Sequence, residues 1–285
     1  MNVELVEQLQ QTQQMLEPRA KALRMATGAL KQALAFAGEA KADAVPMQKA
    51  LLKLQEAAEL VDDEALRAAT EHFQVETEKA LDAVTFEFAK DLREVFTARG
   101  LEVTGRPPTL AVSDLVLSID IAARKAQWFY GREALTRPLP LSLNAIMKAF
   151  EQQKRVVLER ELDTEAFLHE LQTTWSQVLG EKSRRPQGGR VNIIETYSKL
   201  VLNRQSGRFW NAPSRRTFRD YPRPLFVRDL VLAHRSPTVT VDGAQQRLFL
   251  GVATKSQAES ASRSLWLPQT PFEGSYYADV AFETV

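Results

Sequence analysis

Residues 5–34 read LVEQLQQTQQMLEPRAKALRMATGALKQAL, and this stretch decides how the N-terminal part of the chain folds. Its leucines recur every seven residues, at Leu9, Leu16, Leu23 and Leu30. Such spacing is typical of a coiled-coil seam, in which one helix packs on another. Pro18 interrupts the register, because a proline inside a helix lacks one backbone hydrogen bond and clashes with the preceding turn. We therefore expect a kink there, or a new helix with Pro18 at its first position.

More helices are expected before residue 98, because this region is rich in Ala, Leu, Gln, Glu and Lys, which are strong helix formers. A connector over residues 38–46 should precede an apolar-faced helix over residues 51–60. Asp62 or Asp63 can cap the next helix. Its apolar residues lie three or four positions apart, at Leu66, Ala69, Phe73, Ala80, Val84, Phe88 and Leu92. These helices should form a bundle with an internal core, or an arm that docks on a partner.

Near Gly100 the apolar pattern changes from helical spacing to alternation. Leu115, Leu117, Ile119 and Ile121 alternate with other residues, as expected of a half-buried strand, and residues 127–130 suit a returning strand. Pro107-Pro108 is expected to mark the boundary between the helical arm and the following domain. The predicted domains are therefore a helical arm or bundle over residues 1–100 and a mixed domain over residues 101–285.

The mixed domain should contain both helices and strands. Ser142 and Asp163 can each cap a helix, and Gly180 can end the second one. Asp242-Gly243 is a favoured hairpin dipeptide between expected strands at 238–241 and 247–252, with further strands expected at 264–267 and 276–282. The predicted fold class is α+β, in which a long-helix arm or bundle precedes a small domain with a mostly antiparallel sheet.

Composition excludes several kinds of site. The 285 residues include no cysteine, so disulfides, thiol nucleophiles, cysteine-bound zinc and iron–sulfur clusters are impossible. No apolar run approaches the roughly 18 residues of a membrane span, and the N-terminus lacks the pattern of a secretory signal. We expect a soluble cytoplasmic protein that needs no cofactor and does not contact a membrane.

The search for catalytic motifs gives little. Neither a P-loop nor a G-x-G-x-x-G fingerprint occurs, which argues against a P-loop ATPase or a Rossmann enzyme. The three histidines, His72, His169 and His234, are far apart in sequence, and packed or solvated positions explain them better than metal binding. Asp114 and Asp120 lie six residues apart on or beside one strand, so they could share a divalent cation, although solvent-facing positions are the simpler interpretation. No catalytic residue is predicted.

Charge is distributed unevenly along the chain. Residues 181–235 hold 13 basic and 4 acidic residues, a net charge of +9, and subtracting this from the total of +1 leaves −8 elsewhere. Eleven of the 13 basic residues are arginines, whose planar guanidinium groups bind phosphate bidentately and stack on bases. Aromatic residues lie between them, and such rings can stack on the bases of a nucleic acid. The predicted nucleic-acid contacts are Arg184, Arg185, Arg190, Arg204, Arg208, Trp210, Arg215, Arg216, Arg219, Tyr221 and Arg223.

The sequence therefore predicts a non-catalytic, nucleic-acid-binding adaptor subunit of a multiprotein complex, with genome maintenance or defence as one setting. DNA or RNA would bind the basic segment, and a protein partner or a second copy would bind the N-terminal helices. Two interpretations of the arginines stay open beside this one, namely pairing with acidic groups and an ordinary solvated surface. The alternative functions are a metal-dependent nuclease or phosphoester hydrolase, and a purely structural protein–protein interaction subunit.

Overall fold

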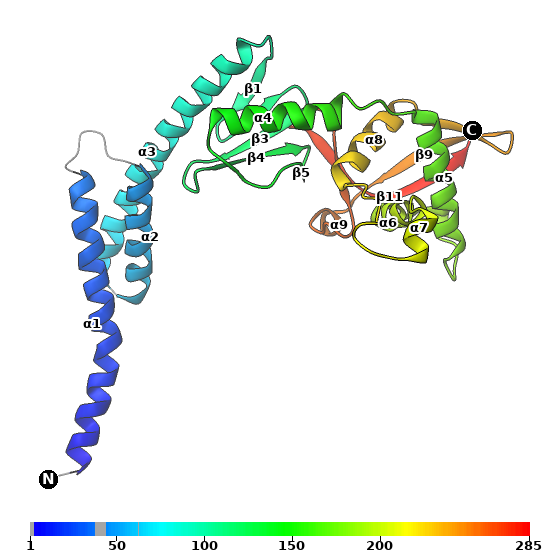
Figure 1. Ribbon diagram of the computed structural model, residues 1–285. Coiled ribbons are helices and arrows are strands. Elements are labelled where there is room, and N and C mark those ends of the chain that lie inside the picture. The colour runs from blue at the N-terminus through cyan, green and yellow to red at the C-terminus, as the bar shows by residue number, and fades with distance from the viewer. Residues whose placement is uncertain (1–2, 38–43, 62) are drawn as a thin grey trace. The chain divides into compact units, whose positions relative to one another are not determined.

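The computed structural model describes residues 3–37, 44–61 and 63–285 (Figure 1). These residues group into two compact units. The helical unit contains the described residues up to Gly100 together with residues 106–108 and 119–126, and the sheet unit contains residues 101–105, 109–118 and 127–285. The predicted α+β class is confirmed, because long helices precede a region of shorter helices and antiparallel sheets.

The described part of the helical unit contains helices α1 (Val3–Ala37), α2 (Ala44–Leu60) and α3 (Glu64–Thr97). Asp63 caps α3 as expected, because its carboxylate accepts a hydrogen bond of 2.8 Å from the backbone N–H of Leu66. The alternative cap, Asp62, and residues 38–43 of the expected connector lie outside the described residues. Since α2 begins at Ala44, Pro46 stands in its first turn, where a proline is tolerated.

Helix α1 runs through Pro18 without a break, so the expected new helix start at this residue is wrong. The proline ring removes the hydrogen bond that the carbonyl of Gln14 would otherwise accept. Every residue from Leu5 to Lys21 is exposed, so water can reach that carbonyl. The proline therefore lowers the stability of the helix, by about 3 kcal/mol on propensity scales, without ending it.

Three of the four heptad leucines of α1 do not pack in the expected seam, whereas Leu30 lies against the buried cluster described below. Leu9, Leu16 and Leu23 are 61%, 53% and 51% exposed. The buried face of α1 is instead a stripe of alanines, at Ala22, Ala26, Ala29 and Ala33. Three of these alanines cluster with Leu54 and Ala57 of α2, because small side chains let two helix backbones approach closely. The prediction of helix packing is confirmed, but its choice of helix face is wrong.

The buried face of α3 also differs from the expected one. Leu66 and Leu92 are buried, but Ala69 and Val84 are exposed. This face instead includes three buried threonines, Thr70, Thr77 and Thr85. Each threonine hydroxyl donates a hydrogen bond of 2.7 Å to the backbone carbonyl four residues earlier. This local bond satisfies the hydroxyl, so threonine can be buried among apolar side chains.

The first sheet joins consecutive strands in the order β1 (Val103–Arg106), β2 (Thr109–Val112), β3 (Leu115–Asp120), β4 (Lys125–Tyr130) and β5 (Glu133–Ala134), and β6 (Leu139–Pro140) pairs with β4. The expected strand and its returning partner correspond to β3 and β4. Pro107-Pro108, the predicted boundary, lies within this sheet. These prolines are joined by a cis peptide bond and stand in the turn between β1 and β2, so the sheet begins before them.

Helices α4 (Leu143–Gln153) and α5 (Thr164–Gly180) follow the first sheet, and a π-helical turn (Lys154–Leu158) extends α4. Asp163 caps α5 as expected, because its carboxylate accepts a hydrogen bond of 2.9 Å from the N–H of Ala166. Gly180 is the last residue of α5. Ser142 precedes α4 at the capping position, but its side chain makes no capping hydrogen bond.

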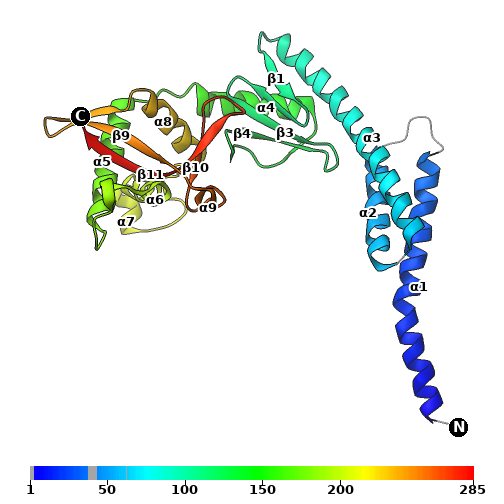
Figure 2. The ribbon, with the colours of Figure 1, turned by 180° about the vertical axis from the view of Figure 1, so that it is seen from behind.

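The second sheet is antiparallel, in the order β10 (Leu265–Pro268), β11 (Gly274–Thr284), β9 (Ala244–Val252) and β8 (Thr238–Val241), with β7 (Val191–Asn192) also paired to β11. Figure 2 shows β9 and β11 as its long central strands. Asp242 and Gly243 form the expected hairpin turn, with φ angles of +49° and +77°. Trp175 of α5 packs on Phe282 of β11, with ring centroids 5.6 Å apart.

The sheet unit also contains the 3-10 turn η2 (Gln187–Gly189) and helices α6 (Ile193–Asn203), α7 (Gly207–Asn211), α8 (Arg223–Arg235) and α9 (Lys255–Ala258). Phe226 of α8 is fully buried and contacts Phe167 of α5 and Tyr197 of α6 through their rings. These contacts fix the two ends of the chain segment that connects α6 with α8. Across the described ranges, no helix has both the length and the hydropathy to cross a membrane.

Candidate nucleic-acid interface

Residues 206–220, which form most of the segment between α6 and α8, are called the arginine loop below. It includes the short helix α7 and carries a net charge of +3, with Asp220 as its one acidic residue. Its basic residues are Arg208, Arg215, Arg216 and Arg219. Five of the predicted contact residues, these arginines and Trp210, therefore lie on one loop of 15 residues.

Hydrogen bonds and ring contacts order the arginine loop from within. The hydroxyl of Thr217 accepts a hydrogen bond from the N–H of Ser214 at 3.0 Å. The ring of Phe209 is half-buried and lies 5.3 Å from the ring of Trp210 and 5.6 Å from that of Phe218, measured between centroids. The backbone that carries the arginines is therefore held in a defined conformation.

The base of the arginine loop is fixed by a buried amide. Gln205 donates to the backbone carbonyl of Arg219 and accepts from its backbone N–H, each at 2.8 Å. Next to it, the hydroxyl of Tyr197 donates to the backbone carbonyl of Tyr221 at 2.6 Å. Because Gln205 directly precedes the loop, its bonds join the two ends of the loop, and the bond of Tyr197 ties the chain just after the loop to α6.

The side chains of the arginine loop face solvent. All four arginines are exposed, and none forms an ion pair with any carboxylate in the part of the chain that the structure describes. Trp210 is 57% exposed and Phe218 is 39% exposed. Exposed guanidinium groups can donate to phosphate oxygens, and exposed rings can stack on unpaired bases. The arrangement can therefore bind a phosphodiester backbone together with its bases.

Three of the predicted contact residues serve the protein interior instead. Arg204 donates two hydrogen bonds to the carboxylate of Glu170, at 2.7 and 2.6 Å, and its guanidinium lies 3.7 Å from the ring centroid of Tyr221. Tyr221 is itself 5% exposed. Arg223 pairs with Glu133 at 2.9 Å. Because these groups already have partners, assigning them to a nucleic-acid surface is not supported by their placement.

Tyr221 also joins a network of buried charges. Its hydroxyl donates to Asp229 at 2.6 Å, and Asp229, which is 1% exposed, pairs with Arg160 and at 3.6 Å with Arg228. Arg228 further donates to the backbone carbonyl of Leu158 at 3.0 Å. Burial, and then the charge of Asp229, raise the pKa of Tyr221 above its ordinary value, so its hydroxyl remains a donor. The network joins α8 to the end of the π-helical turn.

The remaining predicted arginines lie outside the arginine loop. Arg190 is exposed, and its guanidinium covers the ring of Phe249, 4.8 Å from the centroid. Arg184 and Arg185 are exposed between α5 and α6. They precede the first turn of α6, whereas the arginine loop follows its last turn. The eleven predicted contacts therefore do not form one surface, and the arginine loop is their largest group.

Asp114 and Asp120, for which the sequence allowed a shared cation but favoured solvent-facing positions, do not meet. Asp114 stands in the turn before β3 and Asp120 is the last residue of β3, so about 20 Å of strand separates them. The carboxylate of Asp120 accepts a hydrogen bond of 2.8 Å from the N–H of Ala123 in the β3–β4 turn. Within the described ranges, no three His, Asp or Glu side chains are grouped as metal ligands, and the histidines stand on α3, α5 and α8.

The sequence did not single out Gln205, although this residue holds the arginine loop closed. Its two hydrogen-bond partners belong to Arg219, which is 14 residues further along the chain. Glutamine is common on helices and no local pattern distinguishes this one. A partner so distant in sequence could be found only from the fold.

Comparison of the chain with protein-family models, with curated proteins and with solved structures finds no match. A function for the arginine loop therefore has to be argued from its own geometry and charge.

Proposed function

We propose that this protein is a non-catalytic, nucleic-acid-binding subunit of a larger complex, in which the arginine loop holds DNA or RNA. The observation that carries the proposal is the grouping of four exposed arginines, unpaired among the described residues, with the exposed Trp210 on one ordered loop. Guanidinium groups match the bidentate geometry of phosphate oxygens. Single strands are favoured, because stacking on Trp210 and Phe218 requires bases that are not already stacked in a duplex.

The proposal sets a scale for the salt dependence of binding. Each phosphate contact on a single strand contributes a slope of about −0.7 to the plot of log affinity against log salt. If all four arginines contact phosphates, the slope should be about −3. Binding should therefore weaken by a factor of roughly 50 when the salt concentration rises fourfold.

The test is a fluorescence anisotropy titration of the full chain with single-stranded and duplex oligonucleotides at two salt concentrations. The variant with Arg208, Arg215, Arg216 and Arg219 changed to Ala should lose at least about tenfold in affinity at low salt, together with most of the salt slope. A matched control removes four exposed arginines elsewhere in the sheet unit, at Arg137, Arg155, Arg247 and Arg263. Equal losses in both variants would show that total charge, and not the arginine loop, determines binding.

Trp210→Ala separates stacking from charge. A base stacked on an aromatic side chain contributes about 1–3 kcal/mol, so this change should lower single-strand affinity by about tenfold and leave the salt slope unchanged. Absence of binding to any oligonucleotide at low salt would reject the proposed function.

The exposed leucines of α1 support the adaptor part of the proposal. Leu9, Leu16 and Leu23 form an apolar stripe that no described residue of this chain covers. Apolar residues at seven-residue spacing suit contact with another helix, so we assign a protein contact to this stripe. Light scattering of the full chain over a range of concentrations determines whether a second copy supplies that helix. In that case, changing the three leucines to Gln should return the chain to monomer mass.

A further inference from the structure

A second candidate site lies in the sheet unit at the C-terminal end of α8. A hollow of about 260 Å³ separates α8 from β10 and β11. Its apolar wall includes Val231 and Leu267, and the rings of His234 and Tyr277 lie beside each other with centroids 6.4 Å apart. Ligand pockets usually measure about 300–1,000 Å³, so this hollow suits a fragment the size of a single nucleobase.

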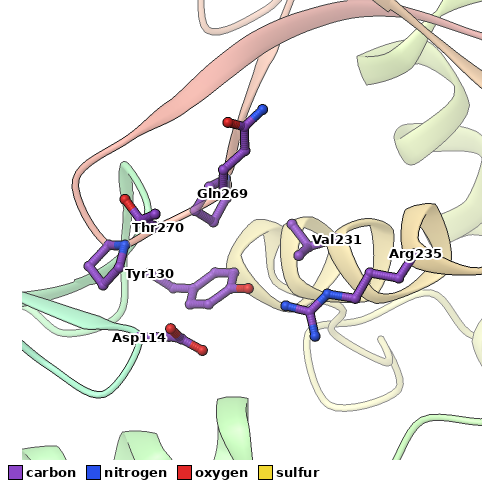
Figure 3. Close-up of a pocket in the computed structure, with 8 residues that line it drawn as sticks. Asp114, Tyr130, Val231, Arg235, Gln269 and Thr270 are labelled. Carbon is purple, nitrogen blue, oxygen red and sulfur yellow. The ribbon is translucent and has the colours of Figure 1, made fainter.

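A small polar cavity of about 20 Å³ adjoins this hollow and shares Arg235 and Gln269 with it. The cavity is large enough for one water molecule, or for one polar edge of a ligand. Figure 3 shows that the carboxylate of Asp114, the hydroxyl of Tyr130 and the guanidinium of Arg235 point into the same space. These three side chains come from the β2–β3 turn, from β4 and from α8, so the fold brings together residues that are distant in sequence.

Tyr130 places a hydrogen-bond donor at the wall of the cavity. The residue is 5% exposed, and its hydroxyl makes no hydrogen bond with any residue that the structure describes. Burial, and then the charge of Asp114, raise the pKa of Tyr130 to about 12, so the hydroxyl is a neutral donor at physiological pH. This hydroxyl opens on the cavity, so it can donate to an acceptor atom of a ligand placed there.

The charges of the cavity select the chemistry of that ligand. Asp114 repels an anion, and Arg235 repels a cation. A neutral planar group that offers both donors and acceptors satisfies all three side chains, because Asp114 accepts while Tyr130 and Arg235 donate. Guanine fits best, since its ring N–H and amino group are donors and its O6 and N7 are acceptors that arginine binds bidentately.

We propose that this hollow binds one unpaired nucleobase, preferably guanine, with its polar edge in the cavity of Asp114, Tyr130 and Arg235. The inference rests on the proposed function, because it adds base selection to a protein that holds nucleic acid through its arginine loop. The same donor–acceptor edge occurs in the side-chain amide of glutamine, so a test must separate these two sources.

The test uses calorimetric titration of the full chain with uncharged probes, namely the four deoxynucleosides and N-acetylglutamine amide. Deoxyguanosine should bind most tightly. Asp114→Asn replaces an acceptor oxygen by a donor and should weaken deoxyguanosine binding by about tenfold, and Tyr130→Phe should weaken it by about fivefold. Asp120→Asn, an exposed aspartate at the other end of β3, is the matched control and should change nothing. Circular dichroism of each variant establishes that it is folded.

The inference is overturned if no nucleoside binds measurably, or if Asp114→Asn and Tyr130→Phe leave the binding unchanged. Binding of N-acetylglutamine amide as tight as that of deoxyguanosine would also overturn it, in favour of an amide site. Nucleosides carry no phosphate, so the variant without the four loop arginines should bind deoxyguanosine like the wild type. Oligonucleotide binding without nucleoside binding therefore defeats this inference alone, whereas nucleoside binding without oligonucleotide binding defeats the proposed function alone.

Discussion

Arg204 and Arg208 stand four residues apart, yet they belong to two different kinds of surface. Arg204 is joined to Glu170 by two hydrogen bonds and covers the ring of Tyr221. Arg208 is exposed and has no ion-pair partner among the described residues. The same contrast separates Arg223, which pairs with Glu133, from the arginines of the arginine loop. What distinguishes the two groups is a carboxylate supplied by a distant part of the chain.

This contrast implies opposite costs for removing a charge. When a buried carboxylate is removed by mutation, the arginines that it paired with lose their partner. An unpaired buried charge strongly lowers the stability of the fold. An exposed arginine has little effect on stability, so its loss should be seen in binding instead. Stability and affinity measured on the same variants can therefore test whether the two groups are truly separate.

The largest effect is expected for Asp229→Ala. The change leaves the buried Arg228 and the hydroxyl of Tyr221 without their shared partner, so the free energy of unfolding should fall by about 3–5 kcal/mol. Urea denaturation followed by circular dichroism measures this loss. Asp220→Ala, an exposed carboxylate on the arginine loop, is the control and should stay within about 0.5 kcal/mol of the wild type. Similar small losses for both variants would break the distinction between buried and exposed charge.

Tyr221→Phe should sharpen the contrast at alkaline pH. The pKa of Tyr221 is raised in the folded protein, whereas an unfolded tyrosine titrates near pH 10. The unfolded state therefore loses its proton first, so the stabilisation is complete below about pH 10 and decreases as the pH rises further. Tyr221→Phe lacks this group, and between about pH 9 and pH 11 its stability should fall less than that of the wild type.

The phenylalanine variant also loses the hydrogen bond to Asp229, so its stability at neutral pH should be lower by about 1–2 kcal/mol. Urea denaturation at each pH gives both quantities. Parallel curves for the two proteins above about pH 10 would contradict a raised pKa for Tyr221.

The parts of the fold that the sequence predicts correctly depend on short-range chemistry. Asp63 and Asp163 each cap a helix through a backbone N–H three residues away, and Asp242-Gly243 forms its turn within its own hairpin. The incorrect predictions concern which face of a helix is buried. Leu9 and Ala22 both lie on α1, and only the surface of α2 selects the alanine stripe for burial. Nothing in the local sequence states how closely the two backbones approach.

The candidate site follows the same rule. The high density of arginine in residues 181–235 points to Arg215 and Arg216, whose side chains are exposed in the structure. It cannot exclude Arg204 or Arg223, because Glu170 and Glu133 lie 34 and 90 residues earlier in the chain. Tyr130 was predicted as part of a strand, and its unpaired hydroxyl becomes visible only when α8 and the β2–β3 turn are placed beside it.

Gln205→Ala should have an intermediate effect on stability and on affinity. Gln205 is buried, but it holds the loop that carries the exposed arginines. The change removes both hydrogen bonds to the backbone of Arg219 and leaves two backbone groups to be satisfied by water, so we expect a loss of about 1–2 kcal/mol in stability. Since the arginine loop would lose its fixed base, single-strand affinity should also fall, by several-fold. Gln177→Ala is a useful comparison, because its amide bonds to Asn203 at the surface and not to the loop. An affinity loss equal to that of Gln205→Ala would argue against a positioning role.

The smallest effect on stability is expected where the largest effect on binding should occur. Arg215→Ala combined with Arg216→Ala removes two exposed side chains without described ion-pair partners, so the free energy of unfolding should change by less than about 0.5 kcal/mol. Single-strand affinity at low salt should nevertheless fall, and the salt slope should become shallower by about 1.4, because two phosphate contacts are lost. The same change at Arg184 and Arg185, which are also exposed but lie at the other end of α6, should reduce the slope by less. Equal effects at both places would extend the interface beyond the arginine loop, whereas a stability loss of several kcal/mol would place Arg215 and Arg216 with the buried arginines instead.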